Sequence, residues 1–201
     1  RSIAIAHRTP GTAYAATTSH GIQKTTDFGL SWKEISPKDK RMNFACWSLS
    51  LEQKKEKELY ACSFSAGLHR ITIDGKLKGT IDPDPSGMFY GIEQVPGSKK
   101  TYFAVSSNDS TGNFGFTLKG GKVWTRVDSG YAATFNSIGY SQRLGRILIG
   151  SWDKGLHLKS VDLKNTERFM PNRITVPISG IVGLSKEDII FTWGDGIYRI
   201  R

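Results

Sequence analysis

The stretch Thr25-Thr26-Asp27-Phe28-Gly29-Leu30-Ser31-Trp32 decides the fold. It sets a hydroxyl residue, an aspartate, a glycine, a second hydroxyl residue and a tryptophan at fixed spacing between two β-rich runs. An aspartate carboxylate can accept backbone N–H groups and close a hairpin turn, and the glycine supplies backbone freedom. The tryptophan is expected to pack on a neighbouring sheet face. Each of these positions therefore has a structural role, and none is arranged for catalysis.

The same spacing recurs in weaker copies further along the chain. The retained positions are Thr117, Gly121 and Trp124 in one copy and Ser160, Asp162 and Thr166 in another. In the first of these copies Lys119 replaces the aspartate, and in the second Glu167 replaces the tryptophan. A third copy keeps only Thr72 and Asp74. The stretch is therefore one element of an internal repeat.

The repeat is marked by a glycine that returns every 41 to 46 residues. These glycines are Gly21, Gly67, Gly112, Gly155 and Gly196. Two of the repeats match closely, since Gly67-Leu68-His69-Arg70-Ile71-Thr72-Ile73-Asp74 parallels residues 155–162. Periods of this length indicate a repeat architecture.

Short β-branched and aromatic runs surround each glycine and predict strands. The runs before the glycines are residues 14–17, 59–62, 102–105, 147–150 and 189–192, and an earlier set covers 2–6, 43–49, 88–94, 135–140 and 178–184. A third strand follows the glycine, and a fourth follows the next turn, as in residues 32–35. No segment keeps a 3.6-residue apolar period, so almost no helix is expected.

Four short strands in each repeat of about 40–45 residues are typical of a propeller blade. The Thr25–Trp32 stretch resembles the Asp box of the BNR-repeat β-propellers, which include sialidase-like, sortilin-like and photosystem II assembly factor-like proteins. The resemblance implies a single all-β domain over residues 1–201. Its approximate blades are 2–37, 42–81, 87–128, 134–170 and 174–201. Because members of this family differ in function, the fold does not settle the activity.

The fifth blade is expected to lack its outer strand, because the sequence ends five residues past Gly196, whereas Trp32 lies eleven residues past Gly21. Either this is a three-stranded closing blade or the parent chain continues into further blades. The start at Arg1, without a methionine, and the abrupt end favour a fragment.

Candidate ligand-binding residues lie in the turns between the second and third strands, on the face that family members usually use. The residue three positions before the repeat glycine is Thr18, Phe64, Trp152 or Trp193 in repeats one, two, four and five. Asp153 and Asp195 are close by in the sequence. Aromatic rings can stack on sugar C–H faces while carboxylates accept hydroxyl donors. The alternative is that these rings have a purely structural role and cover strand ends or pack between blades.

The leading hypothesis is a non-catalytic, lectin-like binding module for a glycan or a protein. The alternative is a sialidase-like glycoside hydrolase or a fragment of one, with Asp82 and Asp84, or Asp153 and Asp195, as the carboxylate pair. No residue maps onto the sialidase catalytic positions, so no catalytic residue is assigned. A second alternative is an assembly or scaffold factor that binds an acidic partner, since the net charge is +10.

Other partners and cofactors have little support in the sequence. No recognised nucleic-acid-binding motif is present, and no apolar run approaches the roughly 20 residues of a membrane span. No cofactor or metal is expected, because His20, His69 and His157 share no ligand geometry. Cys46 and Cys62 could face each other and oxidise, or could be buried free thiols. Cysteine usage does not fix the compartment, and a secreted or extracytoplasmic location is slightly favoured.

Overall fold

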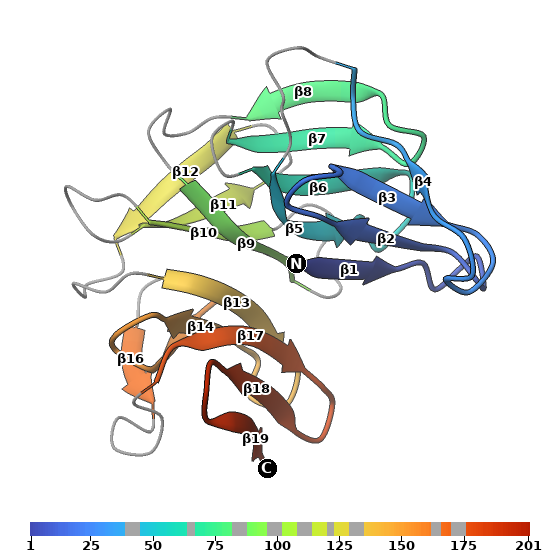
Figure 1. Cartoon of the computed structure of the whole chain (residues 1–201). Coiled ribbons are helices and arrows are strands. Elements are labelled where there is room, and N and C mark those ends of the chain that lie inside the picture. Colours follow the sequence, from blue (N-terminus) through green and yellow to red (C-terminus); the bar gives the residue numbers. More distant parts are fainter. Residues whose placement is uncertain are drawn as a thin grey trace. The chain divides into compact units, whose positions relative to one another are not determined.

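The protein is all-β. The computed structural model describes residues 1–38, 45–63, 67–81, 88–95, 102–107, 114–119, 123–128, 135–161, 166–169 and 176–201. In these ranges nineteen strands form five antiparallel sheets and there is no helix (Figure 1). Consequently, no helix of this part of the chain is long and apolar enough to span a membrane.

Each sheet is a meander of strands consecutive in sequence. Sheet 1 contains β1 (Ser2–Ile5), β2 (Ala13–Ala16), β3 (Ile22–Thr25) and β4 (Lys33–Glu34). Sheet 2 contains β5 (Cys46–Leu51), β6 (Glu58–Ser63), β7 (Leu68–Thr72) and β8 (Leu77–Ile81). Sheet 3 contains β9 (Met88–Gln94), β10 (Tyr102–Ser107), β11 (Phe114–Lys119) and β12 (Val123–Asp128).

The last two sheets follow the same plan. Sheet 4 contains β13 (Phe135–Ser141), β14 (Arg146–Ser151), β15 (Leu156–Ser160) and β16 (Thr166–Phe169). Sheet 5 contains β17 (Ile178–Gly183), β18 (Asp188–Thr192) and β19 (Gly196–Ile200). Sheet 5 therefore has three strands, which confirms the prediction that the fifth blade lacks its outer strand.

The chain divides into two compact units, the N-terminal unit Arg1–Ile92 and the C-terminal unit Glu93–Arg201. Sheets 1 and 2 belong to the N-terminal unit, and sheets 4 and 5 belong to the C-terminal unit. Each unit is described by itself below.

In the N-terminal unit, sheets 1 and 2 bury their facing sides against each other. On β1, Ala4 is buried while Ile3 and Ile5 are exposed, as the two-residue period of a strand requires. The shared core lies between the two sheets and consists of Ala4, Ala6, Tyr14, Ala16, Ile22, Cys46, Leu49, Leu51, Leu59, Ala61 and Ile71. The small alanines of β1 and β2 let the two sheets approach closely.

In the C-terminal unit, glycines allow sheet 5 to approach sheet 4. A Cβ at Gly183 on β17 would lie 1.7 Å from the carbonyl oxygen of Tyr140 on β13. Likewise, a Cβ at Gly139 or Gly150 would lie 2.6 Å from the Cγ2 of Ile181 or Ile178. The contact between the two sheets therefore depends on the absence of side chains at these three positions.

The two cysteines are free and buried in sheet 2. Cys46 pairs with Ser63, and Ser48 pairs with Cys62, on either side of a register shift between β5 and β6. Burial raises the pKa of the Cys46 thiol to about 12, and it also raises the pKa of Cys62. Both side chains are therefore uncharged core residues at neutral pH.

A buried carboxylate fastens sheet 2 to the first turn of sheet 1. Glu56 precedes β6 and is 8% exposed. Its Oε1 accepts the N–H of His7 at 2.8 Å, and its Oε2 accepts the N–H of Arg8 at 3.0 Å. Two charge-assisted bonds to consecutive backbone donors fix the turn after β1 against sheet 2.

Sheets 4 and 5 use the same kind of contact. Asp188, at the start of β18, is fully buried, and its Oδ2 accepts the Ser141 hydroxyl at 2.9 Å. The Arg143 guanidinium lies 3.4 Å from the same oxygen. Ser141 and Arg143 lie at the turn after β13, so in both units an acid of the later sheet binds the first turn of the earlier one.

We expect Glu56→Ala to lower the free energy of unfolding by roughly 2–4 kcal/mol, because it leaves two backbone donors without their acceptor. The matched control is Glu58→Ala. Its partly exposed carboxylate lies 3.8 Å from Arg70 Nε, and its loss should cost less than ~1 kcal/mol. Chemical denaturation of both variants checks the difference, and equal effects would contradict the role assigned to Glu56.

Candidate functional site

The turns between the second and third strands of sheets 1, 2 and 4 are closed by the same backbone hydrogen bond. In each of these three sheets a backbone N–H donates to the carbonyl oxygen of the repeat glycine at 2.9 Å, and the donor lies four residues before that glycine. The donor–acceptor pairs are Thr17–Gly21, Ser63–Gly67 and Ser151–Gly155. The glycines have φ of 58°, 79° and 75°, where an L side chain is strained. In sheet 5 the hydroxyl of Thr192 donates to Gly196 at 2.8 Å, and this glycine has φ of 111°. The described turns are therefore closed in a related way, each through its repeat glycine.

Two of these turns bring Trp152 and Trp193 into contact. Trp152 follows β14, and Trp193 follows β18. Their ring centroids are 5.2 Å apart and their planes are inclined by 86°. Trp152 is 45% exposed and Trp193 is 63% exposed, and the N–H of Trp193 donates to the Pro177 carbonyl at 2.9 Å. Large parts of two mutually perpendicular indoles consequently face solvent as a right-angled corner.

Charged and polar groups flank this corner. Asp153 and Lys154 follow Trp152 in its turn, with the lysine Nζ 3.9 Å from an aspartate oxygen and both side chains about half exposed. Asp195 follows Trp193 by two residues and accepts a hydrogen bond from the Tyr198 hydroxyl. That bond to Asp195 raises the pKa of Tyr198. The carboxylates of Asp153 and Asp195 are acceptors beside an apolar surface, which suits hydroxyl-bearing or amide-bearing ligands.

Several residues singled out in the sequence are not placed by the structure. Phe64, Asp82, Asp84, Gly121 and Asp162 lie outside the described residues. Thr117, Trp124 and Thr166 lie in β11, β12 and β16. Ser160 ends β15 and is partly buried. Of the proposed ligand-binding residues, the structure thus brings together the members from sheets 4 and 5.

The turn between β3 and β4 is closed by the side chain of Asp27. The carboxylate accepts the Ser31 N–H at 2.9 Å, the Ser31 hydroxyl at 2.6 Å and the Thr25 hydroxyl at 2.7 Å. The N–H of Gly29 donates to the Thr25 hydroxyl oxygen at 2.9 Å. These bonds, with the Ser31 hydroxyl the largest contributor, lower the pKa of Asp27 to about 2. Trp32 is 41% exposed, and its Nε1 donates to the Gly29 carbonyl at 3.1 Å. Less of this ring is buried than the sequence predicts.

Sheet 2 repeats part of this arrangement with less sequence support. The Thr72 hydroxyl donates to Asp74 and accepts the N–H of Lys76 at 2.9 Å. As in sheet 1, the threonine oxygen accepts the N–H four residues later. The bond from Thr72 lowers the pKa of Asp74.

The histidines do not form a shared site. His20 is exposed, whereas His69 on β7 and His157 on β15 are buried. The Phe135 ring packs edge-on against His157 at 5.4 Å. Among the described residues no group of three or more histidine, cysteine or acidic side chains is placed to hold a metal ion.

Two features were not found by sequence reasoning. Phe28 and Leu30 are 83% and 89% exposed, at positions that the repeat motif leaves unspecified. Glu56, the acid that joins sheets 1 and 2, lies in a lysine-rich stretch that reads as a solvated loop. The left-handed backbone of Glu56, with φ of 51°, has no signature in the sequence.

Comparison with solved structures defines the fold. The chain is similar to the extracellular domain of a putative hybrid two-component system from B. thetaiotaomicron, with a TM-score of 0.74 and 13% identity over 100% of this chain and 27% of that chain. An ancestral GH74 enzyme matches with a TM-score of 0.70 and 13% identity over 98% of this chain and 35% of that chain. YCF48 bound to D1 peptide matches with a TM-score of 0.68 and 16% identity over 100% of this chain and 63% of that chain. The fold is a β-propeller.

The chain spans less than two thirds of the length of each of these proteins. No family model matches the sequence, and no curated protein matches it. At identities of 13–16% the similarity between this chain and these structures establishes the β-propeller fold alone. The ligand therefore has to be argued from the side chains.

The lowered pKa of Asp27 predicts a pH-dependent contribution to stability. Because the pKa is depressed in the folded protein, the stabilisation is present above the ordinary aspartate value and is lost as the pH falls towards about 2. We expect the difference in melting temperature between the protein and Asp27→Asn to be largest above pH ~4 and to shrink below it. Ser31→Ala should raise the Asp27 pKa, as followed by NMR titration. A difference that is constant across this range would contradict the assignment.

Proposed function

We propose that this chain is a non-catalytic binding module of the Asp-box propeller type, which recognises a glycan or a protein partner through the corner formed by Trp152 and Trp193. The observation that carries the proposal is the contact between two partly exposed indoles from neighbouring sheets. Large aromatic side chains are usually mostly buried, so two that meet while exposed make a candidate recognition surface.

The geometry of the corner suits ligands with an apolar face and a polar rim. Either indole can stack on the C–H face of a sugar or on an apolar side chain, and the second ring, at 86°, limits how that group is oriented. Asp153 and Asp195 can accept hydrogen bonds from hydroxyl or N–H donors at its edge. The turns that hold both rings are built on sheets, which keeps the corner ordered before a ligand arrives.

The similar structures agree with a binding role and leave its details open. One of them is an extracellular domain, and YCF48 was solved with a peptide. An extracytoplasmic location and a glycan or peptide ligand are accordingly part of the proposal. The alternative, a glycoside hydrolase, draws support from the GH74 enzyme and would use Asp153 and Asp195 as carboxylates.

We expect the double variant Trp152→Ala/Trp193→Ala to weaken ligand binding by roughly tenfold or more while the melting temperature changes little, because both rings are partly exposed. The measurement is a screen of a glycan array and a peptide library at low and high salt. Trp32→Ala removes another partly exposed tryptophan, from the other unit, and is the matched control.

Each outcome of this screen is informative. Binding that resists salt and is lost in the double variant supports the proposed site. Equal binding by the wild-type protein and the double variant would contradict the proposed site. Binding that is lost when salt is added, whether or not the tryptophans are present, favours an assembly role with an acidic partner. Turnover of chromogenic glycosides, lost when Asp153 or Asp195 becomes asparagine, would favour the hydrolase.

A further inference from the structure

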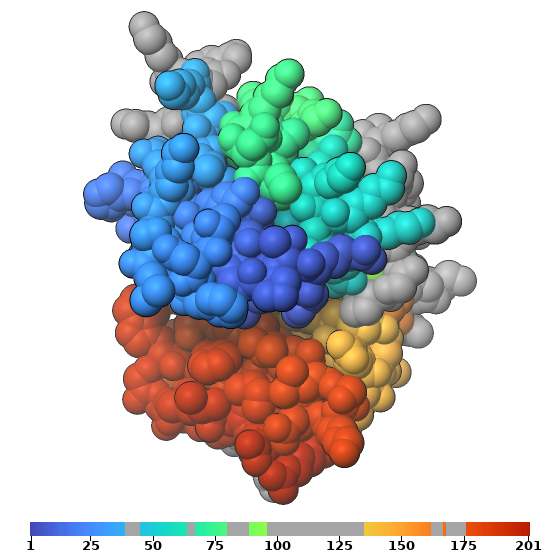
Figure 2. Space-filling view, turned by 90° about the vertical axis from the view of Figure 1, so that its right-hand side faces the viewer, coloured from blue at the N-terminus to red at the C-terminus, as the bar shows by residue number. Residues whose placement is uncertain are grey.

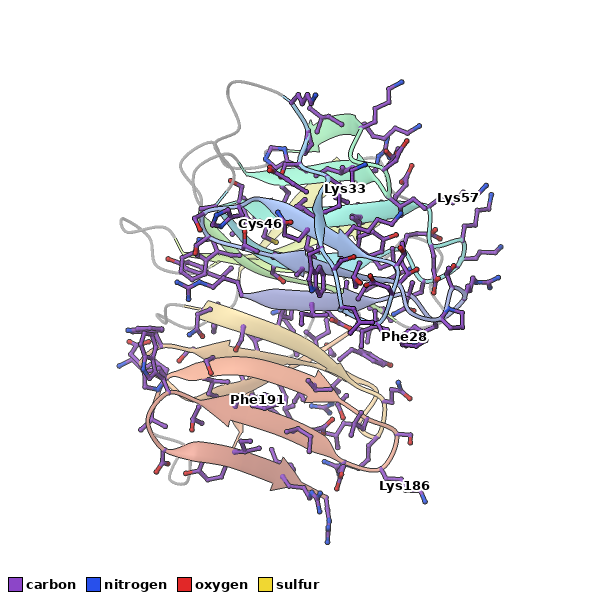
Figure 3. All side chains as sticks on the ribbon, turned by 45° about the vertical axis from the view of Figure 1, so that its right-hand side comes forward. Phe28, Lys33, Cys46, Lys57, Lys186 and Phe191 are labelled. Carbon is purple, nitrogen blue, oxygen red and sulfur yellow. The ribbon has the colours of Figure 1, made fainter. Side chains whose placement is uncertain are left out.

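A second surface, separate from the tryptophan corner, lies at one end of the N-terminal unit. We name it the basic tip and define it as Arg8, Phe28, Leu30, Lys54, Lys55 and Lys57. Its residues come from the turns after β1, β3 and β5, which lie at the right-hand end of this unit in Figure 1. Figure 3 labels Phe28 and Lys57 at this end.

Hydrogen bonds join the three turns of the basic tip into one surface. The N–H of Phe28 donates to the Gly11 carbonyl at 3.0 Å, which ties the β3–β4 turn to the β1–β2 turn. Glu56 accepts the N–H groups of His7 and Arg8 and so ties the β1–β2 turn to the loop that carries the lysines. Figure 2 looks onto this end, where the blue turns and the teal loop adjoin.

The apolar part of the tip protrudes into solvent. Phe28 and Leu30, at 83% and 89%, are the most exposed of the large apolar side chains in the described ranges. They sit on a turn that Asp27 closes from within through its bonds to Thr25 and Ser31. The turn is thus held in shape by its own polar groups. One edge of the Phe28 ring lies beside Gly11 of the β1–β2 turn, where an added Cβ would be 3.1 Å from its Cε2.

Two residues in the turns of the tip have a left-handed backbone. Phe28 has φ of 61° and Glu56 has φ of 51°, and they are the two non-glycine residues with positive φ in the described part of the chain. Glycine or asparagine adopts this conformation more readily than phenylalanine. Since most of the Phe28 side chain is exposed from this position, its ring is available for contacts outside the chain.

The cations of the tip are exposed, whereas the carboxylates of Glu52, Glu56 and Asp27 are turned towards N–H and hydroxyl donors. Both oxygens of Glu56 accept backbone N–H groups, and Glu52 accepts the N–H groups of Lys54 and Lys55. Arg8, Lys54, Lys55 and Lys57 are all exposed, and in the described ranges none of them forms an ion pair. Four exposed cations and two exposed apolar side chains therefore lie on the same joined turns, together with three carboxylates that are less exposed.

We propose that the basic tip docks on the surface of a lipid bilayer that contains anionic lipids, with Phe28 and Leu30 inserted between headgroups and the cations against them. A partner peptide normally lies in a groove or along a sheet edge, whereas this surface is a projecting turn. Protruding aromatic and aliphatic residues beside lysine and arginine are the pattern that interfacial binding uses. The net charge of +10 acts in the same direction.

Sedimentation of the full chain with vesicles tests this proposal. The vesicles are phosphatidylcholine alone or phosphatidylcholine mixed with phosphatidylserine, each at low and high salt. We expect binding to the mixed vesicles and little to the neutral ones, because each cation near an anionic surface strengthens binding roughly fivefold. Equal binding to both vesicles, or binding to neither, overturns the proposal.

Two variants separate the charged and apolar contributions. Lys54→Gln/Lys55→Gln/Lys57→Gln should weaken binding by about two orders of magnitude, whereas Lys78→Gln/Lys154→Gln/Lys186→Gln, with the same change in net charge, should weaken it far less. Phe28→Asn/Leu30→Gln should weaken binding by roughly tenfold or more without loss of stability, since asparagine suits the left-handed backbone. Unchanged vesicle binding in this apolar variant, with displacement by polyglutamate, would instead identify a surface for acidic peptides and overturn the bilayer assignment.

Discussion

The arrangement of neighbouring sheets depends on a buried carboxylate that the later sheet places against the first turn of the earlier one. Burial of apolar side chains between two β-sheets opposes their separation, but it does not fix how one sheet is positioned along the other, because apolar contacts are not directional. A buried carboxylate must have donors, so it fixes position. Glu56 meets this need with two backbone N–H groups, and the Oδ2 of Asp188 meets it with Ser141 and Arg143. The core then supplies the free energy while the acid sets the register between sheets.

The two ends of each sheet are built differently, and this difference decides where function can vary. Turns between the second and third strands need one backbone hydrogen bond and a glycine with positive φ, which leaves the residues between them free to change. The β3–β4 turn instead uses the side chains of Thr25, Asp27 and Ser31, and the side chains of Thr26, Phe28 and Leu30 take no part in these bonds. Ligand residues can therefore be exchanged in both kinds of turn without altering the strands.

The sequence predicted those features that repeat or act locally. The spacing of Gly21, Gly67, Gly155 and Gly196 gave the strands on either side, because each glycine is needed for the backbone of its own turn. Trp152 and Trp193 stand at equal distances from these glycines, and the contact between their rings arises because equivalent positions in adjacent sheets lie close together. In contrast, Glu56 and Asp188 act on turns of another sheet, 48 and 47 residues away, from positions that are not equivalent in the repeat. Periodicity cannot reveal such pairs, and neither can residue type, because an acid in a lysine-rich loop also suits a solvated surface.

The exposure of the basic tip has the same physical origin. Asp27 satisfies the polar groups of its turn internally, so the turn needs no apolar anchor, and Phe28 and Leu30 are free to face solvent. Glu56 is held between the sheets by the N–H groups of His7 and Arg8, so this carboxylate is buried while Lys54, Lys55 and Lys57 of the same loop are exposed. The bonds that hold sheets 1 and 2 together thus also leave the cations of this loop, and not Glu56, facing solvent at this end. A surface of this kind arises from the packing of the sheets, and for this reason a residue-by-residue scan of charge runs does not find it.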